Sequence, residues 1–284
     1  MDDTVSQARK YILLIQSDIV RKSLKLTSAK AFFFDMDGVL SVGKEKPRYL
    51  GGREIVARIK DTGRQAYVLT NDSTHTRQEL HQNLSNLGFS FVLEDILTSS
   101  YLTASYLKEK VKANVSFFLI GERGLQRELE DAGHNSTDTQ PDVVIVGLDR
   151  KLTYEKLNSA LQFLKNGALL IGSYGGTVYM SDHGPAMSAG PIIKALEYAS
   201  DRRAIMIGKP STHMFRLALN RANVKASQAV MIGDQIETDL IGAHKVGLRT
   251  VLVLTGVETE ETLKRSKIKP ELILNNVDIL AKYI

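Results

Sequence analysis

The stretch FFFDMDGVL, residues 32 to 40, places three consecutive aromatic residues before two aspartates that are separated by one methionine. A run this apolar is typical of a buried strand, and Asp and Gly favour turns because of local hydrogen bonding and small size. A core strand followed by an ordinary turn would therefore explain the stretch. The alternative is functional, because Asp35 and Asp37 carry like charges that repel each other, and the rest of the chain must decide.

The bulk composition describes an ordinary globular protein. The chain has 284 residues, of which 43% are hydrophobic and 24% charged, so it can form one large domain or two of usual size. It contains no cysteine, which excludes disulfides, thiolate nucleophiles and Cys-ligated zinc sites. The net charge of +5 is spread without a basic block, which favours a small anion over nucleic acid or a membrane surface as the partner.

The N-terminal region has no sign of a signal peptide. Asp2 and Asp3 replace a basic segment, and the apolar run YILLI (11–15) is too short to span a membrane, so we expect a cytoplasmic protein. Apolar residues recur at helical spacing over 5–25, which predicts an amphipathic helix in an N-terminal extension, 1–27. That helix would pack on its own protein or, alternatively, on a partner or membrane.

Short apolar runs then alternate with segments of helical length. Buried strands are predicted at residues 31–37, 65–72, 116–121, 142–148, 167–172, 204–209, 229–234 and 250–256. Continuous apolar strands separated by helices indicate a largely parallel sheet covered on both faces. The sequence therefore predicts an α/β protein.

Polar residues follow several of these strands, and ligands of open parallel sheets bind beyond the carboxyl ends of the strands. The candidates are Asp35, Asp37, Thr70, Asn71, Lys209 and Asp234. Lys209 follows Thr70 by 139 residues, far more than one strand-helix-strand unit needs. We therefore expect an inserted α/β domain at 112–203, within a core formed by 28–111 and 204–284.

Taken together, DMDGV (35–39), LTND (69–72), GKP (208–210) and GDQIETD (233–239) resemble the motifs of haloacid dehalogenase superfamily phosphatases. The segment VVIVGLDRKLTYEKLNSAL (143–161) is similar to the p-nitrophenylphosphatase or NagD-like branch in particular. The resemblance spans about residues 28–284. It implies a Rossmann-like parallel-sheet core with an inserted α/β cap domain, and a Mg²⁺-dependent hydrolase of small phosphomonoesters that forms an aspartyl-phosphate.

The chemistry of phosphate ester hydrolysis suits the strand-end residues. The uncatalysed reaction is very slow, and attack by a carboxylate divides it into two easier steps. Asp35, at the tip of its strand, is the candidate nucleophile. By resemblance, Asp37 protonates the leaving oxygen and later takes a proton from water, and neighbouring carboxylates would favour the raised pKa that this role needs.

Several carboxylates around a phosphate dianion require compensating positive charge, which Lys209 and a divalent cation would supply. By resemblance, Mg²⁺ is held by the Asp35 carboxylate, the Asp37 main-chain carbonyl and Asp234, and Asp239 supports the metal's waters or Lys209. Thr70 would bind the phosphoryl group, and Asn71 would position the nucleophile or the phosphate.

Each motif also has an ordinary structural explanation. Thr70 and Asn71 would serve as helix N-caps, and Lys209 would be a surface lysine before a proline that starts a helix. Their combination in order favours the phosphatase. The alternatives that stay open are a phosphotransferase or mutase on the same scaffold and a signalling protein that accepts phosphate on Asp35 without turnover.

The loop GSYGGTVYMSDHG (172–184) departs from related caps, which usually carry a Thr-Asn or Thr-Asp pair followed by an acidic residue and prolines. Because this loop would contact the leaving group, Tyr174, Tyr179 and His183 are the candidates for substrate contact. No zinc, nucleoside triphosphate or dinucleotide motif is present. We expect a small phosphorylated metabolite as substrate, no nucleic acid or membrane partner, and a possible homodimer.

Overall fold

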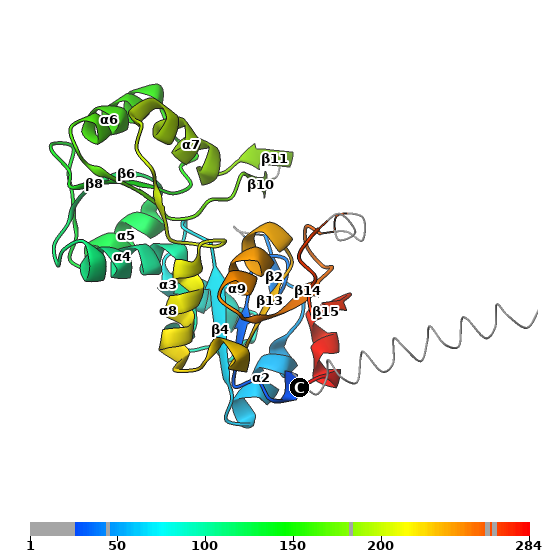
Figure 1. Ribbon diagram of the computed structural model, residues 1–284. Helices are drawn as coiled ribbons and strands as arrows, with labels where there is room; N and C mark the ends of the chain where they lie inside the picture. Colours follow the sequence, from blue (N-terminus) through cyan, green and yellow to red (C-terminus); the bar gives the residue numbers. More distant parts are fainter. Residues whose placement is uncertain (1–25, 44–45, 182–183, 259–261, 263–265) are drawn as a thin grey trace, which may run out of the picture.

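The structure is a computed structural model that describes residues 26–43, 46–181, 184–258, 262 and 266–284. Most of the predicted N-terminal helix and His183 lie outside these described residues. Two parallel sheets organise the chain: a six-stranded core sheet and a five-stranded cap sheet, with helices on both faces of each (Figure 1). The predicted α/β class and the inserted α/β cap are both confirmed.

The core sheet has the order β15-β14-β13-β1-β4-β5, and all its pairs are parallel. Its strands are β1 (Ala31–Phe34), β4 (Gln65–Thr70), β5 (Ile96–Thr98), β13 (Ala229–Gly233), β14 (Arg249–Val253) and β15 (Leu272–Leu274). From β1 the chain moves to β4 on one side and later to β13 on the other. In folds of this kind, ligands bind beyond the carboxyl ends of the strands at the point where the strand order reverses.

Helices cover both faces of the core sheet. They are α2 (Arg53–Asp61) and α3 (Arg77–Asn86) on one face, and α4 (Ser99–Lys110), α8 (Thr212–Ala222) and α9 (Ile241–Lys245) on the other. Short helical turns are η1 (Leu93–Asp95), η2 (Ala226–Gln228), the π-helix η3 (Ile236–Leu240) and η4 (Val277–Lys282). No helix in the described ranges is long and apolar enough to cross a membrane.

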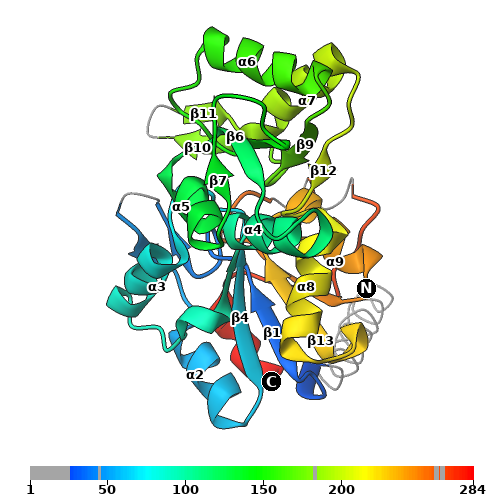
Figure 2. The same cartoon turned by 90° about the vertical axis from the view of Figure 1, so that its left-hand side faces the viewer.

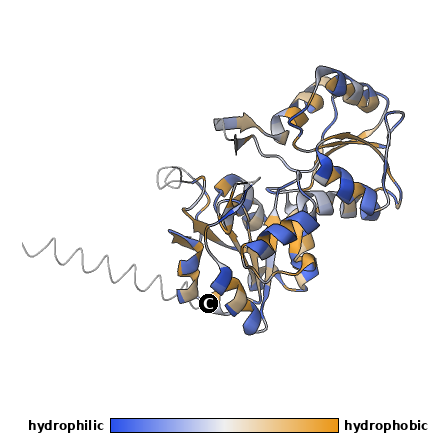
Figure 3. Cartoon of the chain, turned by 180° about the vertical axis from the view of Figure 1, so that it is seen from behind, coloured by the Kyte–Doolittle hydropathy of each residue, from blue (hydrophilic) through white to orange (hydrophobic). Residues whose placement is uncertain are grey.

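The aromatic run before Asp35 is central to this core. Phe32 and Phe34 face the cluster formed with α2 and α3, whereas Phe33 faces the cluster formed with α4 and α8. All three side chains are fully buried, because alternate residues of a strand point to opposite faces and both faces are covered. In Figure 3 the strands of both sheets accordingly carry the hydrophobic colour.

The cap sheet has the order β12-β9-β8-β6-β7 and is also parallel. Its strands are β6 (Ser116–Ile120), β7 (Asn135–Ser136), β8 (Val143–Val146), β9 (Leu169–Gly172) and β12 (Ile205–Met206). Its helices are α5 (Arg123–Asp131), α6 (Tyr154–Lys165) and α7 (Ala189–Ser200). Two antiparallel pairs complete the fold: β2 (Ser41–Val42) with β3 (Arg48–Tyr49), and β10 (Val178–Ser181) with β11 (Gly184–Met187).

The cap packs directly on the core, and Figure 2 shows α4 at their junction. One apolar cluster runs through both parts: it contains Phe33 of the core sheet, Leu107 of α4 and Ile145 of the cap sheet. Main-chain hydrogen bonds join them as well, since Gly124 N donates to Thr74 O (3.2 Å) and Leu125 N donates to Ser73 O (3.0 Å). The first residues of α5 are therefore hydrogen-bonded to Ser73 and Thr74, in the segment that follows Asn71.

All eight predicted strands are present, and each is shorter than its apolar run. The strands β5, β7 and β15 and both antiparallel pairs were not predicted. Residues 205–206 pair with β9 of the cap sheet, although they follow the predicted end of the insertion at 203. The chain therefore returns to the core after Met206, only three residues before Lys209.

Candidate active site

Five of the predicted site residues lie at the carboxyl ends of three adjacent core strands: Asp35, Asp37, Thr70, Asn71 and Asp234. Lys209 instead follows β12, which pairs with the cap sheet and not with the core sheet as predicted. Phe34, the last residue of β1, is aligned with Ile232 of β13 and with Val68 of β4. Because the strands are parallel, Asp35, Thr70 and Asp234 leave the sheet at the same edge. The fold thus gathers residues that are up to 199 positions apart (234 − 35).

Three buried carboxylates form an acidic cluster at this edge. One oxygen from each of Asp35, Asp234 and Asp239 lies within 4.8 Å of the others. Asp239 reaches the cluster from the π-helix η3, and its side chain packs against Gly233 at the end of β13. A group of carboxylate oxygens with this spacing matches the ligands that Mg²⁺ prefers.

Lys209 supplies positive charge inside the cluster. Its Nζ donates to Asp35 Oδ1 and to Asp239 Oδ1, both at 2.6 Å, and only 2% of the residue is exposed. Charge-assisted hydrogen bonds of this length are among the stronger ones in proteins. The lysine thereby fixes the orientation of two carboxylates whose charges would otherwise repel.

Burial and mutual repulsion dominate the ionisation of the carboxylates. Burial, with added repulsion from Asp35 and Asp239, raises the pKa of Asp234 to about 9. Burial also raises the pKa of Asp239 to about 6, against the opposing effect of Lys209, and it raises the pKa of Asp35. Burial lowers the pKa of Lys209, but Asp239 and Asp35 outweigh this effect and raise that pKa. Lys209 thus offsets only part of the mutual repulsion among the three buried carboxylates.

The surroundings of Asp234 fit a bound cation. Its Oδ2 accepts from Val257 N at 3.0 Å, whereas its buried Oδ1 has no hydrogen-bond partner within the described residues. Buried carboxylate oxygens are nearly always satisfied, and a metal ligand is one explanation for an exception. The oxygen donors that the cluster presents are carboxylates, which suit a hard divalent cation.

Asp37 lies on the turn that follows β1. It is half-buried, forms a bridge with Ser41, and its charge contributes to the raised pKa of Asp35. It is not a member of the acidic cluster. Gly38 has φ of +83°, and a Cβ there would lie 2.5 Å from Asp234 Oδ2, so the Asp-Gly turn both reverses the chain and lets it approach Asp234.

Thr70 is the last residue of β4, and Asn71 follows it. Thr70 is buried, and its Oγ1 accepts from Asp72 N at 3.1 Å. The Asn71 amide pairs with the main chain of Lys209 through both its ends, since Nδ2 donates to Lys209 O (3.0 Å) and Lys209 N donates to Oδ1 (2.9 Å). Asn71 therefore joins the end of β4 to the segment that carries the lysine.

The three cap candidates differ in their placement. Tyr174 is buried in the apolar cluster of the cap, and its hydroxyl lies 2.8 Å from Ser188 Oγ; its contact with substrate stays a prediction. Tyr179 lies half-buried on β10, and its contact with substrate stays a prediction. His183 lies outside the described residues.

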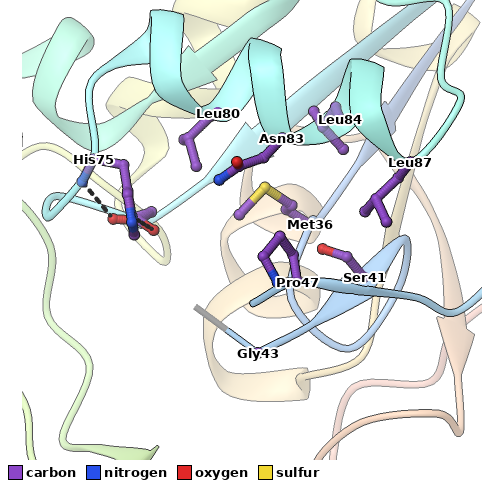
Figure 4. Close-up of a pocket in the computed structure, with 10 residues that line it drawn as sticks. Met36, Ser41, Gly43, Pro47, His75, Leu80, Asn83, Leu84 and Leu87 are labelled. Carbon is purple, nitrogen blue, oxygen red and sulfur yellow. Dashed lines mark hydrogen bonds and ion pairs between the residues drawn. The ribbon is translucent and has the colours of Figure 1, made fainter. Parts of the chain in front are cut away.

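Two hollows adjoin these elements. Figure 4 shows one beside Met36, Asn83 and His75, with a volume of about 10 Å³, which is room for about one water. A larger cavity in the cap, of about 170 Å³, is lined by apolar side chains of Leu148, Leu152 and Ile192 together with Asp149. Of these two hollows among the described residues, the cap cavity is the one large enough to accept part of a small organic molecule.

Sequence reasoning missed the residues that hold the site together. Asp72 Oδ1 accepts from Thr74 N (2.7 Å) and His75 N (3.2 Å), which fixes the loop beneath α5. Gly256 packs so closely that a Cβ there would overlap the Asp234 carboxylate. An Asp followed two residues later by Thr is a typical turn pattern and could have indicated the first; nothing local indicated the second.

The fold and the site define a capped α/β hydrolase with an acidic, lysine-bridged centre at the switch point of its core sheet. A family model described as haloacid dehalogenase-like hydrolase matches residues 32–135, and a second HAD-hydrolase-like model matches 206–280. The chain belongs to this family. The recognition of the NagD-like phosphatases is confirmed by the relatives.

Two characterised relatives and two solved structures illustrate the similarity. Dihydroxyacetone phosphatase of Corynebacterium glutamicum is 32% identical over 88% of this chain and 90% of its own length. Ribonucleotide monophosphatase NagD of Escherichia coli K12 is 31% identical over 86% and 94%. The 4-nitrophenylphosphatase of Thermotoga maritima has a TM-score of 0.85 at 29% identity over 91% and 98% of the chains, and E. coli NagD has 0.79 at 30% over 88% and 97%. The protein is accordingly a HAD-type phosphatase, a hydrolase acting on phosphoric monoesters.

Proposed function

We propose that this protein is a Mg²⁺-dependent phosphatase that hydrolyses small phosphomonoesters through an aspartyl-phosphate on Asp35. The buried cluster of Asp35, Asp234 and Asp239, bridged by Lys209, carries the proposal. Such a concentration of negative charge is stable only with further positive charge beside it. HAD-type family membership supports a divalent cation, and the oxygen donors favour Mg²⁺ among the common ones.

In the proposed reaction, Lys209 holds the Asp35 carboxylate in place while the other carboxylate oxygen attacks phosphorus. The Thr70 hydroxyl binds a phosphoryl oxygen at the end of β4. Asp37, two residues after Asp35 on the turn, donates its proton to the leaving oxygen. The same carboxylate then takes a proton from the water that attacks the aspartyl-phosphate, which returns Asp35 and releases phosphate.

The metal would be held by Asp35, Asp234 and the main-chain carbonyl of Asp37, with Asp239 acting on it indirectly through Lys209. When bound, the divalent ion would neutralise charge on the phosphoryl oxygens and lower the repulsion among the carboxylates. Among the described residues Asp234 Oδ1 has no hydrogen-bond partner, which supports its role as a ligand.

The substrate class remains that of small phosphorylated metabolites. The relatives' names point to dihydroxyacetone phosphate, nucleoside monophosphates and p-nitrophenyl phosphate as the first compounds to compare. A panel of such esters ranked by kcat/KM would identify the preferred class, because this ratio measures differential binding of the transition state. We keep the cytoplasmic location expected from the sequence as part of the same proposal.

The substitution Asp35→Asn tests the nucleophile. The amide has nearly the same shape but is a poor nucleophile, so turnover of p-nitrophenyl phosphate should fall by about 10⁴-fold or more while the circular dichroism spectrum is unchanged. Asp61→Asn, at an exposed position on α2, is the matched control and should keep parental turnover. Substantial turnover by Asp35→Asn would remove Asp35 from its proposed role.

Metal removal and product analysis test the remaining parts. Chelation of divalent ions should stop turnover, and added Mg²⁺ should restore it. Release of free phosphate over many turnovers supports hydrolysis. A single stoichiometric phosphorylation would indicate a phosphate-accepting signalling protein instead, and transfer to an added sugar would indicate a phosphotransferase.

A further inference from the structure

We propose that Asn71 is a positioning residue for Lys209, and that it acts on the reaction through the lysine. This inference rests on the proposed function, because it presumes that Lys209 assists turnover. Its basis is the pair of hydrogen bonds between the Asn71 amide and the Lys209 main chain, at 2.9 and 3.0 Å. These two residues are 138 positions apart, so only the tertiary fold brings them together.

The two hydrogen bonds from Asn71 fix the main chain from which the long Lys209 side chain extends. Lysine has four rotatable bonds and loses up to about 2 kcal/mol of conformational entropy when it is ordered. In Lys209 the far end is held by Asp35 and Asp239, and the near end by Asn71. A shift of the Lys209 main chain would therefore have to be absorbed at Nζ, between two carboxylates.

The neighbouring residue shows how tightly this main chain is confined. Gly208 N donates to Ser173 O at 2.7 Å, and this hydrogen bond continues the pairing of β12 with β9 of the cap sheet. A Cβ on Gly208 would lie 2.5 Å from Ser173 O and 2.6 Å from Asn71 Oδ1. The segment before the lysine thus fits between the end of the cap sheet on one side and Asn71 on the other.

The competing assignment is direct contact between the Asn71 side chain and the phosphoryl group. One N–H of the amide is used on Lys209 O, and the second could donate to a substrate oxygen. The two roles differ in one measurable respect. A positioning role requires Lys209 to be present, whereas direct contact with phosphate does not.

A double-mutant cycle separates the two roles. Asn71→Ala and Lys209→Met are made singly and together, and turnover of p-nitrophenyl phosphate and the inhibition constant of inorganic phosphate are measured for each. Asn71→Ala should lower kcat about 10- to 100-fold, since misplacing a working group by about 1 Å can cost about a hundredfold. In the Lys209→Met background, the same change should alter kcat and phosphate inhibition by less than about twofold.

Ser99→Ala is the matched control. Ser99 is buried, and its Oγ donates to the main-chain oxygen of Asn71 at 3.1 Å, so its loss disturbs the same residue without touching the amide. It should leave kcat within about threefold of the parent. Thermal unfolding of every variant is recorded, so that a general loss of structure is recognised.

Equal losses from Asn71→Ala with and without Lys209 would overturn the inference and assign the amide to the phosphate. It would also be overturned if Lys209→Met had parental turnover. Failure of the proposed function would give a different result, namely substantial turnover by Asp35→Asn. The coupling between Asn71 and Lys209 can be determined in either case.

Discussion

Substituting Gly256 by alanine should disable the site through Asp234 alone. Gly256 follows β14 and lies against the Asp234 carboxylate, and its backbone is not in the left-handed region, so alanine causes no conformational strain there. The added Cβ would lie 2.5 Å from Asp234 Cγ and 2.7 Å from its Cβ. Ordinary van der Waals contact begins at 3.4 Å, so the two groups must separate by at least 0.9 Å (3.4 − 2.5).

A displacement of this size has a definite expected cost. Misplacing a working group by about 1 Å can reduce turnover about a hundredfold. This corresponds to about 2.7 kcal/mol of transition-state stabilisation, at about 1.36 kcal/mol for each tenfold change. The shift also threatens the 3.0 Å hydrogen bond from Val257 N to Asp234 Oδ2. Because Asp234 is a proposed metal ligand, the concentration of Mg²⁺ needed for half-maximal activity should rise as well.

The assay is a Mg²⁺ titration of p-nitrophenyl phosphate turnover. Gly175→Ala is the control, since a Cβ at Gly175 would meet only the terminal methyl of Met206, at 3.3 Å, and this flexible group can move. The control should behave like the parent. If Gly256→Ala keeps the parental kcat and Mg²⁺ requirement, Asp234 is either not displaced by the new methyl group or not needed for turnover.

Two further predictions concern charge. Lys209→Met leaves the Asp35 and Asp239 carboxylates buried without the lysine charge. The free energy of unfolding, measured in urea without added metal, should therefore fall by about 3–5 kcal/mol, and kcat should fall at least a hundredfold. An unchanged urea midpoint would contradict this expectation. Burial raises the pKa of Glu128 on α5, so the native state holds the proton more tightly than the unfolded chain does. The resulting stabilisation of the native state is complete below the ordinary carboxyl pKa of 4.5. It is lost as the pH rises through the raised pKa of the folded protein. Glu128→Gln removes the titration, so its stability relative to the parent should increase from about pH 4 to pH 7 in denaturant unfolding, and a constant difference would refute the assignment.

The sequence was sufficient to predict the layers of the fold. Continuous apolar runs such as 229–234 and 250–256 predict buried parallel strands, because a strand covered on both faces must be apolar on both. It was insufficient for β15 and for the hairpin of β10 and β11, which are short edge or surface elements with polar or exposed positions. Such elements are specified by their neighbours more than by their own composition.

The candidate site was predictable where it depends on strand ends. Asp35, Thr70 and Asp234 converge because parallel strands end at one edge, and this follows from the order of the motifs alone. The bond between Lys209 and Asp239 and the pairing of Asn71 with Lys209 depend on side-chain reach across the fold, which no local pattern encodes. Tyr174 shows a limit of loop patterns: the structure buries its ring in the apolar cluster of the cap, which its place in a loop did not indicate, and its contact with substrate stays a prediction.

The junction at Gly124 limits how this scaffold can be re-engineered by exchanging whole lids between homologues. A Cβ at Gly124 would lie 2.5–2.6 Å from main-chain atoms of Thr74 and His75, which cannot rotate aside as a side chain can. A cap domain taken from a homologue with any larger residue at this point could not pack its α5 against Thr74 and His75 in the same position. Chimaeras should therefore inherit the glycine with the incoming module, or carry the receiving loop along with it.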